Sequence, residues 1–276
     1  MIDVSAKNIF KTGGRMILAG IEAGGTKFIV GVAEADQVKR TLNIIAHSRF
    51  LTGEPQQTIK DVIKFFQQTL LDLKAKRNTQ LRYEALGIAS FGPLDLSPES
   101  AQFGSITTTP KRAWRHYPLK KVLEAHLGVP VAIDTDVAGA ALGEARYGAG
   151  KGARHLAYMT VGTGIGVGII INGAIARGVT HPEFGHIYVR TSPGDDFPGV
   201  CPYHGDCLEG LASGPAIEKR TGARGEALSS DHPVWDHVAY VLGEAVVTLL
   251  LSVGPEKVIL GGGVMKQASL FPRIRR

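Results

Sequence analysis

One pattern occurs twice in this chain: an apolar run, a turn rich in glycine, and a second apolar run. The first copy is "ILAGIEAGGTKFIVGV", residues 17–32, and the second is "HLAYMTVGTGIGVGIIING", residues 155–173. Two β-type runs joined by a tight glycine turn predict a β-hairpin. Because the pattern returns in the second half of the chain, we expect two related α/β lobes that divide near Asp136.

The segments around the two copies alternate between helix and strand. Apolar residues at helical spacing predict a helix over residues 55–74, and the apolar run 83–90 predicts a strand. A strand over 129–136 and a helix over 137–148 follow, and residues 244–265 predict a buried helix, then a strand, then three glycines. This order of elements is typical of an α/β protein.

Residues 178–215 interrupt this alternation. They show little periodicity, and they contain many Gly, Pro and His residues and both cysteines of the chain. A segment of this length without a regular pattern predicts a functional insertion. We therefore expect an N-terminal extension (1–15), an N-terminal lobe (16–136) and a C-terminal lobe (137–276) that contains the insertion.

Composition and charge restrict the functions that the chain can have. Its 276 residues carry a net charge of +6, and the basic residues are scattered along the chain. This distribution argues against a nucleic-acid-binding face and suits a small anionic ligand such as a nucleotide. Two cysteines cannot form a secreted disulfide framework, no apolar run reaches the ~18 residues of a membrane span, and the first fifteen residues lack a signal peptide's apolar stretch. We expect a cytoplasmic protein with no membrane and no nucleic-acid partner.

The glycine turns are candidate phosphate sites, because glycine lets the backbone approach a phosphate and point N–H groups at it. "GIEAGGTK" is not a P-loop, since Thr26 precedes Lys27, and neither "GTGIGVG" nor "GGGVM" matches the dinucleotide fingerprint. Any one of these turns alone is most simply an ordinary hairpin turn. Three of them, each after a predicted buried strand, favour a bound nucleotide. The candidate residues are Gly24, Gly25, Thr26, Lys27, Thr163, Gly164, Gly261, Gly262 and Gly263.

The two cysteines lie in the stretch "CPYHGDC", where Cys201, His204 and Cys207 follow one another with two-residue gaps. This spacing offers three of the four ligands of a structural zinc, and His186 is the first candidate for the fourth, with His181 second. A disulfide between the cysteines is disfavoured in a reducing cytoplasm. The spacing alone leaves two interpretations open, a zinc site and a pair of unligated thiols.

Three carboxylates are candidates for the chemistry. Asp136 follows a predicted strand and precedes a predicted helix, where it could accept a proton from a substrate hydroxyl or cap the helix. The residues leave these two roles open. Glu183 and Glu209 lie in or beside the insertion, where each could bind sugar hydroxyls or remain a solvated loop carboxylate.

Seven motifs together resemble the ROK family of repressors, open-reading-frame proteins and sugar kinases. In chain order they are "GIEAGGTK", "SFGPLDL", "DTDVAGAALGE", "VGTGIGVG", "HPEFGH", "CPYHGDCLEGLASGPAI" and "VILGGGV", and they cover residues 17–265. The first and sixth are similar to the bacterial fructokinase branch. The resemblance implies two ribonuclease-H-like lobes of the actin/hexokinase-like ATPase fold, with ATP and sugar in the cleft and an inserted zinc-binding loop.

The resemblance also implies roles for single residues. It makes Asp136 the general base, places Glu183, His186 and Glu209 at the sugar, and makes His186 the fourth zinc ligand in a structural site. Magnesium accompanies ATP, and Glu22 would hold it through water. The chain departs from the family's pattern at Ala138, where an Asn is usual.

The expected function is phosphorylation of a hexose by ATP, with D-fructose as the acceptor and fructose 6-phosphate as the product. A mannokinase or glucokinase and a catalytically impaired sugar-binding protein are the alternatives. A sugar-sensing repressor would need a helix-turn-helix before the kinase-like body, and the fifteen N-terminal residues have no helical period. We expect a homodimer. We also expect a truncated C-terminal lobe, because the family has a further helix where "KQASLFPRIRR" offers about two turns, interrupted by Pro272.

Overall fold

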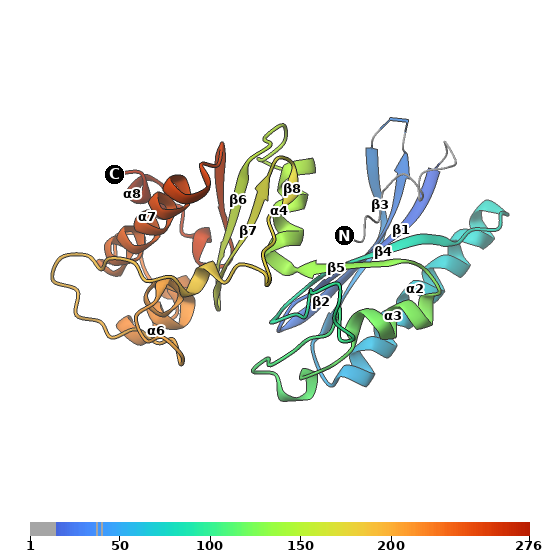
Figure 1. The fold of residues 1–276 in the computed structure, drawn as a ribbon, viewed down its shortest axis with the longest axis horizontal. Coiled ribbons are helices and arrows are strands. Elements are labelled where there is room, and N and C mark those ends of the chain that lie inside the picture. Colours follow the sequence, from blue (N-terminus) through green and yellow to red (C-terminus); the bar gives the residue numbers. More distant parts are fainter. Residues whose placement is uncertain (1–14, 37, 40) are drawn as a thin grey trace. The chain divides into compact units, whose positions relative to one another are not determined.

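The computed structural model describes residues 15–36, 38–39 and 41–276, and these form two compact units (Figure 1). Unit 1 ends at Gly139 and unit 2 begins at Ala140. The predicted N-terminal extension lies outside the described residues, apart from Arg15.

Unit 1 is built on one mixed five-stranded sheet with the strand order β3-β2-β1-β4-β5. The three N-terminal strands are antiparallel neighbours, whereas β4 is parallel to β1 and β5 is parallel to β4. The first predicted hairpin is confirmed as β1 and β2. The strands are β1 (Arg15–Ala23), β2 (Lys27–Asp36), β3 (Thr41–Leu51), β4 (Tyr83–Ser90) and β5 (Val131–Thr135).

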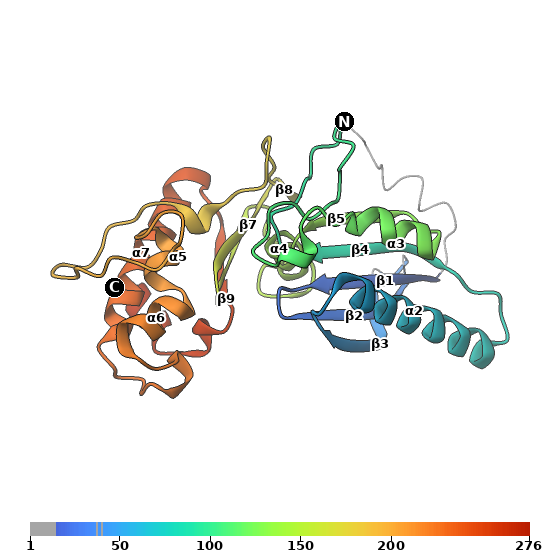
Figure 2. The same ribbon diagram turned by 90° about the horizontal axis from the view of Figure 1, so that it is seen from below.

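Two long helices cover one face of this sheet, α2 (Pro55–Arg77) and α3 (Leu119–Leu127) (Figures 1 and 2). The predicted helix over 55–74 is confirmed and extends three residues further. Its buried face presents Phe66 to the ring of Tyr83 in an edge-on contact of 5.7 Å between centroids. A short 3-10 turn, η1 (Arg112–Trp114), adds a second aromatic cluster to the core, in which Trp114 packs against Phe28 at 5.3 Å.

Unit 2 repeats the strand arrangement of unit 1 with one strand fewer. Its sheet has the order β8-β7-β6-β9, in which β6 and β7 form the second predicted hairpin and β9 runs parallel to β6. The strands are β6 (Leu156–Val161), β7 (Ile165–Ile171), β8 (Ala174–Ile175) and β9 (Lys257–Gly261). The prediction of a buried strand before the three glycines was wrong, because β9 lies at the sheet edge and its side chains are half-buried or exposed.

Helices α5, α6 and α8 of unit 2 pack against α7. By its length and composition alone, α7 could cross a membrane. The Val238, Leu242 and Leu249 side chains of α7 are buried in the hydrophobic core of the unit, so these apolar residues serve to pack the core. The helical elements are α4 (Asp136–Tyr147, which begins in unit 1), η2 (Phe184–His186), α5 (Leu208–Ala212), α6 (Gly214–Thr221), η3 (Gly225–Ala227), α7 (Val234–Val253), η4 (Val264–Lys266) and α8 (Leu270–Ile274).

Several elements differ from the sequence-based expectations. Strand β3 and helix α3 were not predicted, and the end of the predicted insertion is helical rather than irregular, because α5 (208–212) and the start of α6 (from 214) lie in it. Pro272 does not interrupt a helix, because it lies in the first turn of α8, where a missing backbone N–H costs no hydrogen bond.

Candidate functional site

The parallel strands of unit 1 end together, and the candidate residues of this unit follow those ends. Ala23 of β1 is aligned with Ser90 of β4, which is aligned with Thr135 of β5. The carboxyl ends of these strands therefore meet at one edge of the sheet, which is where ligands bind in open α/β sheets. The glycine turn follows β1 at this edge, and Asp136 follows β5.

The glycine turn after β1 is narrow, and hydrogen bonds from the residue that follows β3 hold it in place. The Gly24 N–H donates to the Lys27 carbonyl at 2.9 Å, and a Cβ at Gly24 would lie 2.8 Å from that same oxygen. Thr52 fixes the turn from outside, because its hydroxyl donates to the Gly24 carbonyl at 2.8 Å and its N–H to the Thr26 carbonyl at 3.0 Å. The turn keeps Gly25 half-buried and Thr26 exposed, as a phosphate site needs.

Asp136 is the first residue of α4 and is half-buried. The capping role that the sequence left open belongs mainly to Thr135, whose hydroxyl accepts from the Ala138 N–H at 3.2 Å. The Asp136 Oδ1 atom accepts from the N–H of Val137 at 2.9 Å. Asp136 therefore lies directly after β5, with one carboxylate oxygen held by the backbone at the start of α4.

Two further carboxylates share one face of this sheet. Glu22 is aligned with Ala89, and Ala89 with Asp134, so the two acidic residues stand on the same side two strand spacings apart, or roughly 10 Å. Glu22 is exposed beside the glycine turn, whereas Asp134 is 8% exposed and accepts from the Thr135 N–H at 2.8 Å. Glu22 is thus the more accessible of these two carboxylates.

In unit 2 the turn after β6 contains Thr163 and Gly164, and Glu209 of α5 is packed directly against it. The Glu209 Oε2 atom accepts from the Ile165 N–H at 3.0 Å. A Cβ at Gly164 would lie 2.6 Å from that oxygen, so the absence of a side chain is what allows the contact. The turn is also joined to the start of α6, because the Gly214 N–H donates to the Gly162 carbonyl at 2.7 Å.

The third glycine turn follows β9 and lies against the end of β6. Thr160 is aligned with Gly261 in the parallel pair, so both glycine turns of unit 2 follow the carboxyl ends of neighbouring strands, at the same end of the sheet. Gly262 has φ of 94° and sits so close to Val161 that a Cβ would collide with its backbone. A left-handed conformation and this close approach together require glycine at position 262.

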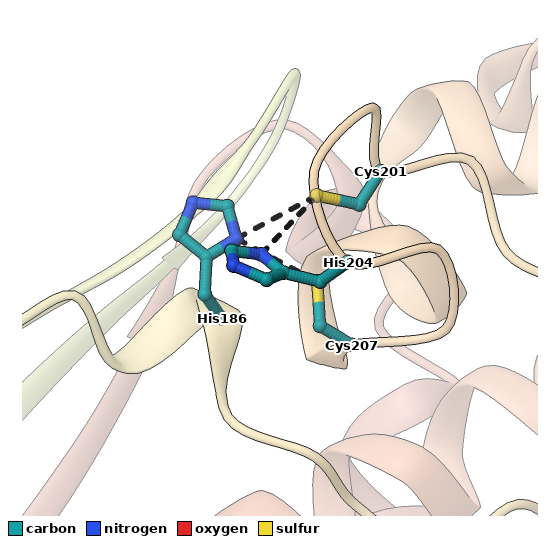
Figure 3. A group of neighbouring side chains, drawn as sticks. All are labelled: His186, Cys201, His204 and Cys207. Atoms are coloured by element: carbon teal, nitrogen blue, oxygen red, sulfur yellow. Dashed lines mark hydrogen bonds between the residues drawn. The ribbon is translucent and has the colours of Figure 1, made fainter.

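The four predicted zinc ligands come together in unit 2 (Figure 3). The ligand atoms of His186, Cys201, His204 and Cys207 all lie within 4.8 Å of one another. His186 is brought to the cysteines by backbone pairing, because the Leu208 N–H donates to the Ile187 carbonyl at 2.9 Å. The other candidate, His181, is not in the cluster, and its Nδ1 atom lies 3.2 Å from Glu183 Oε1.

The spacing of these ligand atoms fits a tetrahedral zinc. Zn–S bonds of about 2.3 Å and Zn–N bonds of about 2.05 Å at the tetrahedral angle separate sulfur from nitrogen by about 3.6 Å. Cys201 Sγ lies 3.7 Å from Nδ1 of both His186 and His204, and Cys207 Sγ lies 3.6 Å from His186 Nδ1. Burial raises the pKa of the Cys207 thiol to about 11, so a bound cation is what would favour its thiolate.

The segment before the cysteines is held by a buried ion pair that sequence reasoning missed. Arg220 of α6 donates to both carboxylate oxygens of Asp195, at 2.7 and 2.8 Å, and its guanidinium lies 3.9 Å from the ring centre of Phe197. The Asp195 and Arg220 side chains are only 4% and 9% exposed. This pair attaches the middle of the insertion to a helix of the core.

Comparison with known proteins agrees with this arrangement. A model of the ROK family matches residues 18–276. The chain belongs to the ROK family. Among ROK relatives it is 45% identical to a putative fructokinase of Bacillus subtilis (strain 168) over 94% of this chain and 81% of that protein. It is 41% identical to a fructokinase of Lactococcus lactis subsp. cremoris over 93% of this chain and 82% of that protein.

A solved ROK structure shares the fold. The glucokinase of Streptomyces griseus in complex with glucose and AMPPNP superposes with a TM-score of 0.66 and 28% identity, over 94% of this chain and 87% of that one. The ROK chain described here therefore has the α/β fold with mixed sheets that was expected.

The Asp195–Arg220 pair gives this ROK protein an expected acid sensitivity. The Arg220 hydrogen bonds lower the pKa of Asp195 below its usual value. A lowered pKa stabilises the folded state above the unfolded value of about 3.9, and this contribution is lost as the pH falls through the folded value. Asp195→Asn should therefore destabilise the protein by about 3 kcal/mol at pH 7 and flatten the loss of stability below about pH 4.

Urea unfolding midpoints at pH 7, 4 and 3 measure this effect. Asp236→Asn is the matched control, since Asp236 pairs with Arg273 but is 75% exposed, and it should cost less than about 1 kcal/mol. If the unfolding midpoint of the Asp195→Asn variant fell with pH as steeply as that of the wild type, the assignment would be contradicted.

Proposed function

We propose that the chain is an ATP-dependent hexose kinase that converts D-fructose to fructose 6-phosphate. The observation that carries this proposal is the identity of 45% and 41% with two fructokinases over more than nine-tenths of the chain. The two units, each with a β-hairpin and a parallel strand, would be the two ribonuclease-H-like lobes of an actin/hexokinase-like ATPase. The repeated sheet order supports this assignment.

Fructose is preferred to glucose as the acceptor on the strength of those identities. The solved glucokinase is 28% identical to this chain, well below the two fructokinases. Glucose and mannose remain the alternative acceptors.

Asp136 is the proposed general base. Its carboxylate takes the proton from the acceptor hydroxyl, the hydroxyl oxygen forms a bond to the terminal phosphorus of ATP, and the bond from that phosphorus to the ADP oxygen breaks. The products are the sugar phosphate, ADP and a proton. The position of Asp136 supports this role, because the residue follows β5 directly and is only half-buried, which leaves it accessible to a substrate.

The three glycine turns are the proposed phosphate-binding elements. Gly24, Gly25, Thr26 and Lys27 would bind phosphate from unit 1, and Thr163, Gly164, Gly261, Gly262 and Gly263 would bind nucleotide from unit 2. Magnesium would offset phosphate charge, and Glu22 is the residue proposed to hold it through water.

Glu183, His186 and Glu209 are the proposed sugar-binding residues. One oxygen of Glu209 is already held by the Ile165 N–H, which fixes the carboxylate and leaves its other oxygen for a hydroxyl. The Nδ1 atom of His186 faces the two cysteines, so its Nε2 atom is directed away from the metal cluster. A sugar hydroxyl could bind there while His186 also serves as a zinc ligand.

Zinc is proposed as a structural ion held by His186, Cys201, His204 and Cys207. Four protein ligands leave no position for water, so zinc would fix the loop and take no part in the transfer. It would set the distance between Glu183, beside His186, and Glu209, two residues after Cys207. A cytoplasmic location and a homodimer belong to the same proposal.

An ADP-release assay with fructose, mannose, glucose and N-acetylmannosamine tests the kinase. Fructose should give the highest kcat/KM, and Asp136→Asn should lower kcat by about 10² to 10⁴-fold because the base is lost. Asp72→Asn, an exposed carboxylate on α2, is the control and should keep wild-type activity. No turnover with any sugar would favour the impaired sugar-binding alternative, and an active Asp136→Asn variant would disprove the base assignment.

Metal analysis of protein purified without chelator tests the zinc proposal. The wild type should contain about one zinc per chain, and Cys207→Ser should lose it and melt about 5 °C lower or more. Tyr203→Ala, in the same loop but 73% exposed, should retain the metal. A metal-free wild type, or a Cys207→Ser variant with full zinc, would overturn the assignment.

A further inference from the structure

The glycine turn after β1 has a cation beside it that neither the motifs nor the assigned roles include. Lys111 lies in the loop between Ile106 and η1, and its Cε atom is 3.4 Å from the position that a Cβ of Gly25 would occupy. Its ammonium nitrogen is one C–N bond of about 1.5 Å further on, so it lies within about 5 Å of that position. The lysine stem therefore lies within van der Waals distance of the turn at Gly25.

The backbone of Lys111 is fixed on both sides. Before it, Thr109 is 2% exposed, and its hydroxyl and carbonyl accept from the Lys111 N–H at 3.4 Å and from Arg115 Nε at 2.8 Å. After it, the N–H of Trp114 donates to the Lys111 carbonyl at 2.9 Å. The side chain therefore leaves from a rigid loop.

The same scaffold supports the lysine and the glycine turn. The Trp114 indole, which is 1% exposed, donates to the Gly53 carbonyl at 2.9 Å. Gly53 follows Thr52, the residue that braces the Gly24 and Thr26 carbonyls. Trp114 thus links the Lys111 loop to the brace of the turn, which fixes the position of the cation relative to the turn.

In the described part of the chain, no side-chain partner accounts for the position of Lys111. The side chain is half-buried, and within residues 15–36, 38–39 and 41–276 its ammonium makes no hydrogen bond or ion pair. Holding a long cationic side chain beside a glycine turn costs side-chain rotamer entropy. The attraction between the ammonium and an anion bound in the turn would offset this cost. Lysine supplies a point charge and three donors, which suits a phosphoryl group.

We propose that Lys111 binds the terminal phosphoryl group of the bound nucleoside triphosphate and stabilises its charge during transfer. This inference rests on the proposed kinase function and adds a catalytic residue to it. The phosphoryl oxygens gain charge contacts from the Gly24–Gly25 turn and from the Lys111 ammonium together, while Asp136 takes the proton from the acceptor. In this step Lys111 supplies charge and hydrogen-bond donors and takes no part in the proton transfer.

The test compares Lys111→Met, which keeps the stem and removes the charge, with Lys111→Arg and with Arg112→Met. Arg112 is the adjacent exposed cation and serves as the control for net charge. Lys111→Met should lower kcat for fructose by about 100-fold with KM for fructose within about twofold, because the contact is made to the transferred group. Lys111→Arg should recover part of this loss, and Arg112→Met should behave as the wild type.

A binding titration separates this inference from the kinase proposal. Lys111→Met should weaken Mg·AMPPNP binding by about tenfold and leave Mg·ADP binding unchanged, whether or not the wild type phosphorylates fructose. If the wild type lacks turnover but shows this difference, the proposed function fails and the Lys111 assignment stands. Equal effects on both nucleotides, or a Lys111→Met variant that matches Arg112→Met in both binding and kcat, would overturn the assignment.

Discussion

Parallel strand pairing is the constraint on which the candidate residues of both units depend. In unit 1 it aligns Ala23, Ser90 and Thr135 at the carboxyl ends of their strands. The glycine turn after β1 and Asp136 after β5 therefore lie at the same end of the sheet, although they are more than a hundred residues apart in the chain. In unit 2 it aligns Thr160 with Gly261 and brings two glycine turns together. A sheet with a slipped register would separate these groups and turn alternate side chains to the opposite face.

In unit 2 the insertion also positions candidate residues, through side-chain contacts as well as strand pairing. Its cysteines and histidines fit a zinc ion, its Asp195 is clamped by Arg220, and its end becomes the helix that carries Glu209. Glu209 then contacts the turn after β6 through the Ile165 N–H. The proposed metal site, the carboxylate proposed to bind sugar and the turn proposed to bind nucleotide are therefore connected by short covalent segments and direct hydrogen bonds.

The sequence predicted the hairpins, the α/β class and the metal cluster because each has a local signature. The turn in "EAGGTK" and the spacing of Cys201, His204 and Cys207 specify geometry over a few residues. The Asp195–Arg220 pair and the Lys111 contact with Gly25 join residues that are far apart in sequence, and no local pattern marks them. Strand β3 was missed because its side chains are mostly exposed and show no apolar alternation.

Every catalytic role proposed for these residues depends on phosphoryl transfer to the sugar, which ³¹P NMR of the complete reaction measures. With protein, Mg·ATP and fructose present, the terminal phosphate signal of ATP should be replaced by that of fructose 6-phosphate, in equal amount to the ADP formed. Release of inorganic phosphate without a sugar ester, or an unchanged ATP spectrum, would contradict the account.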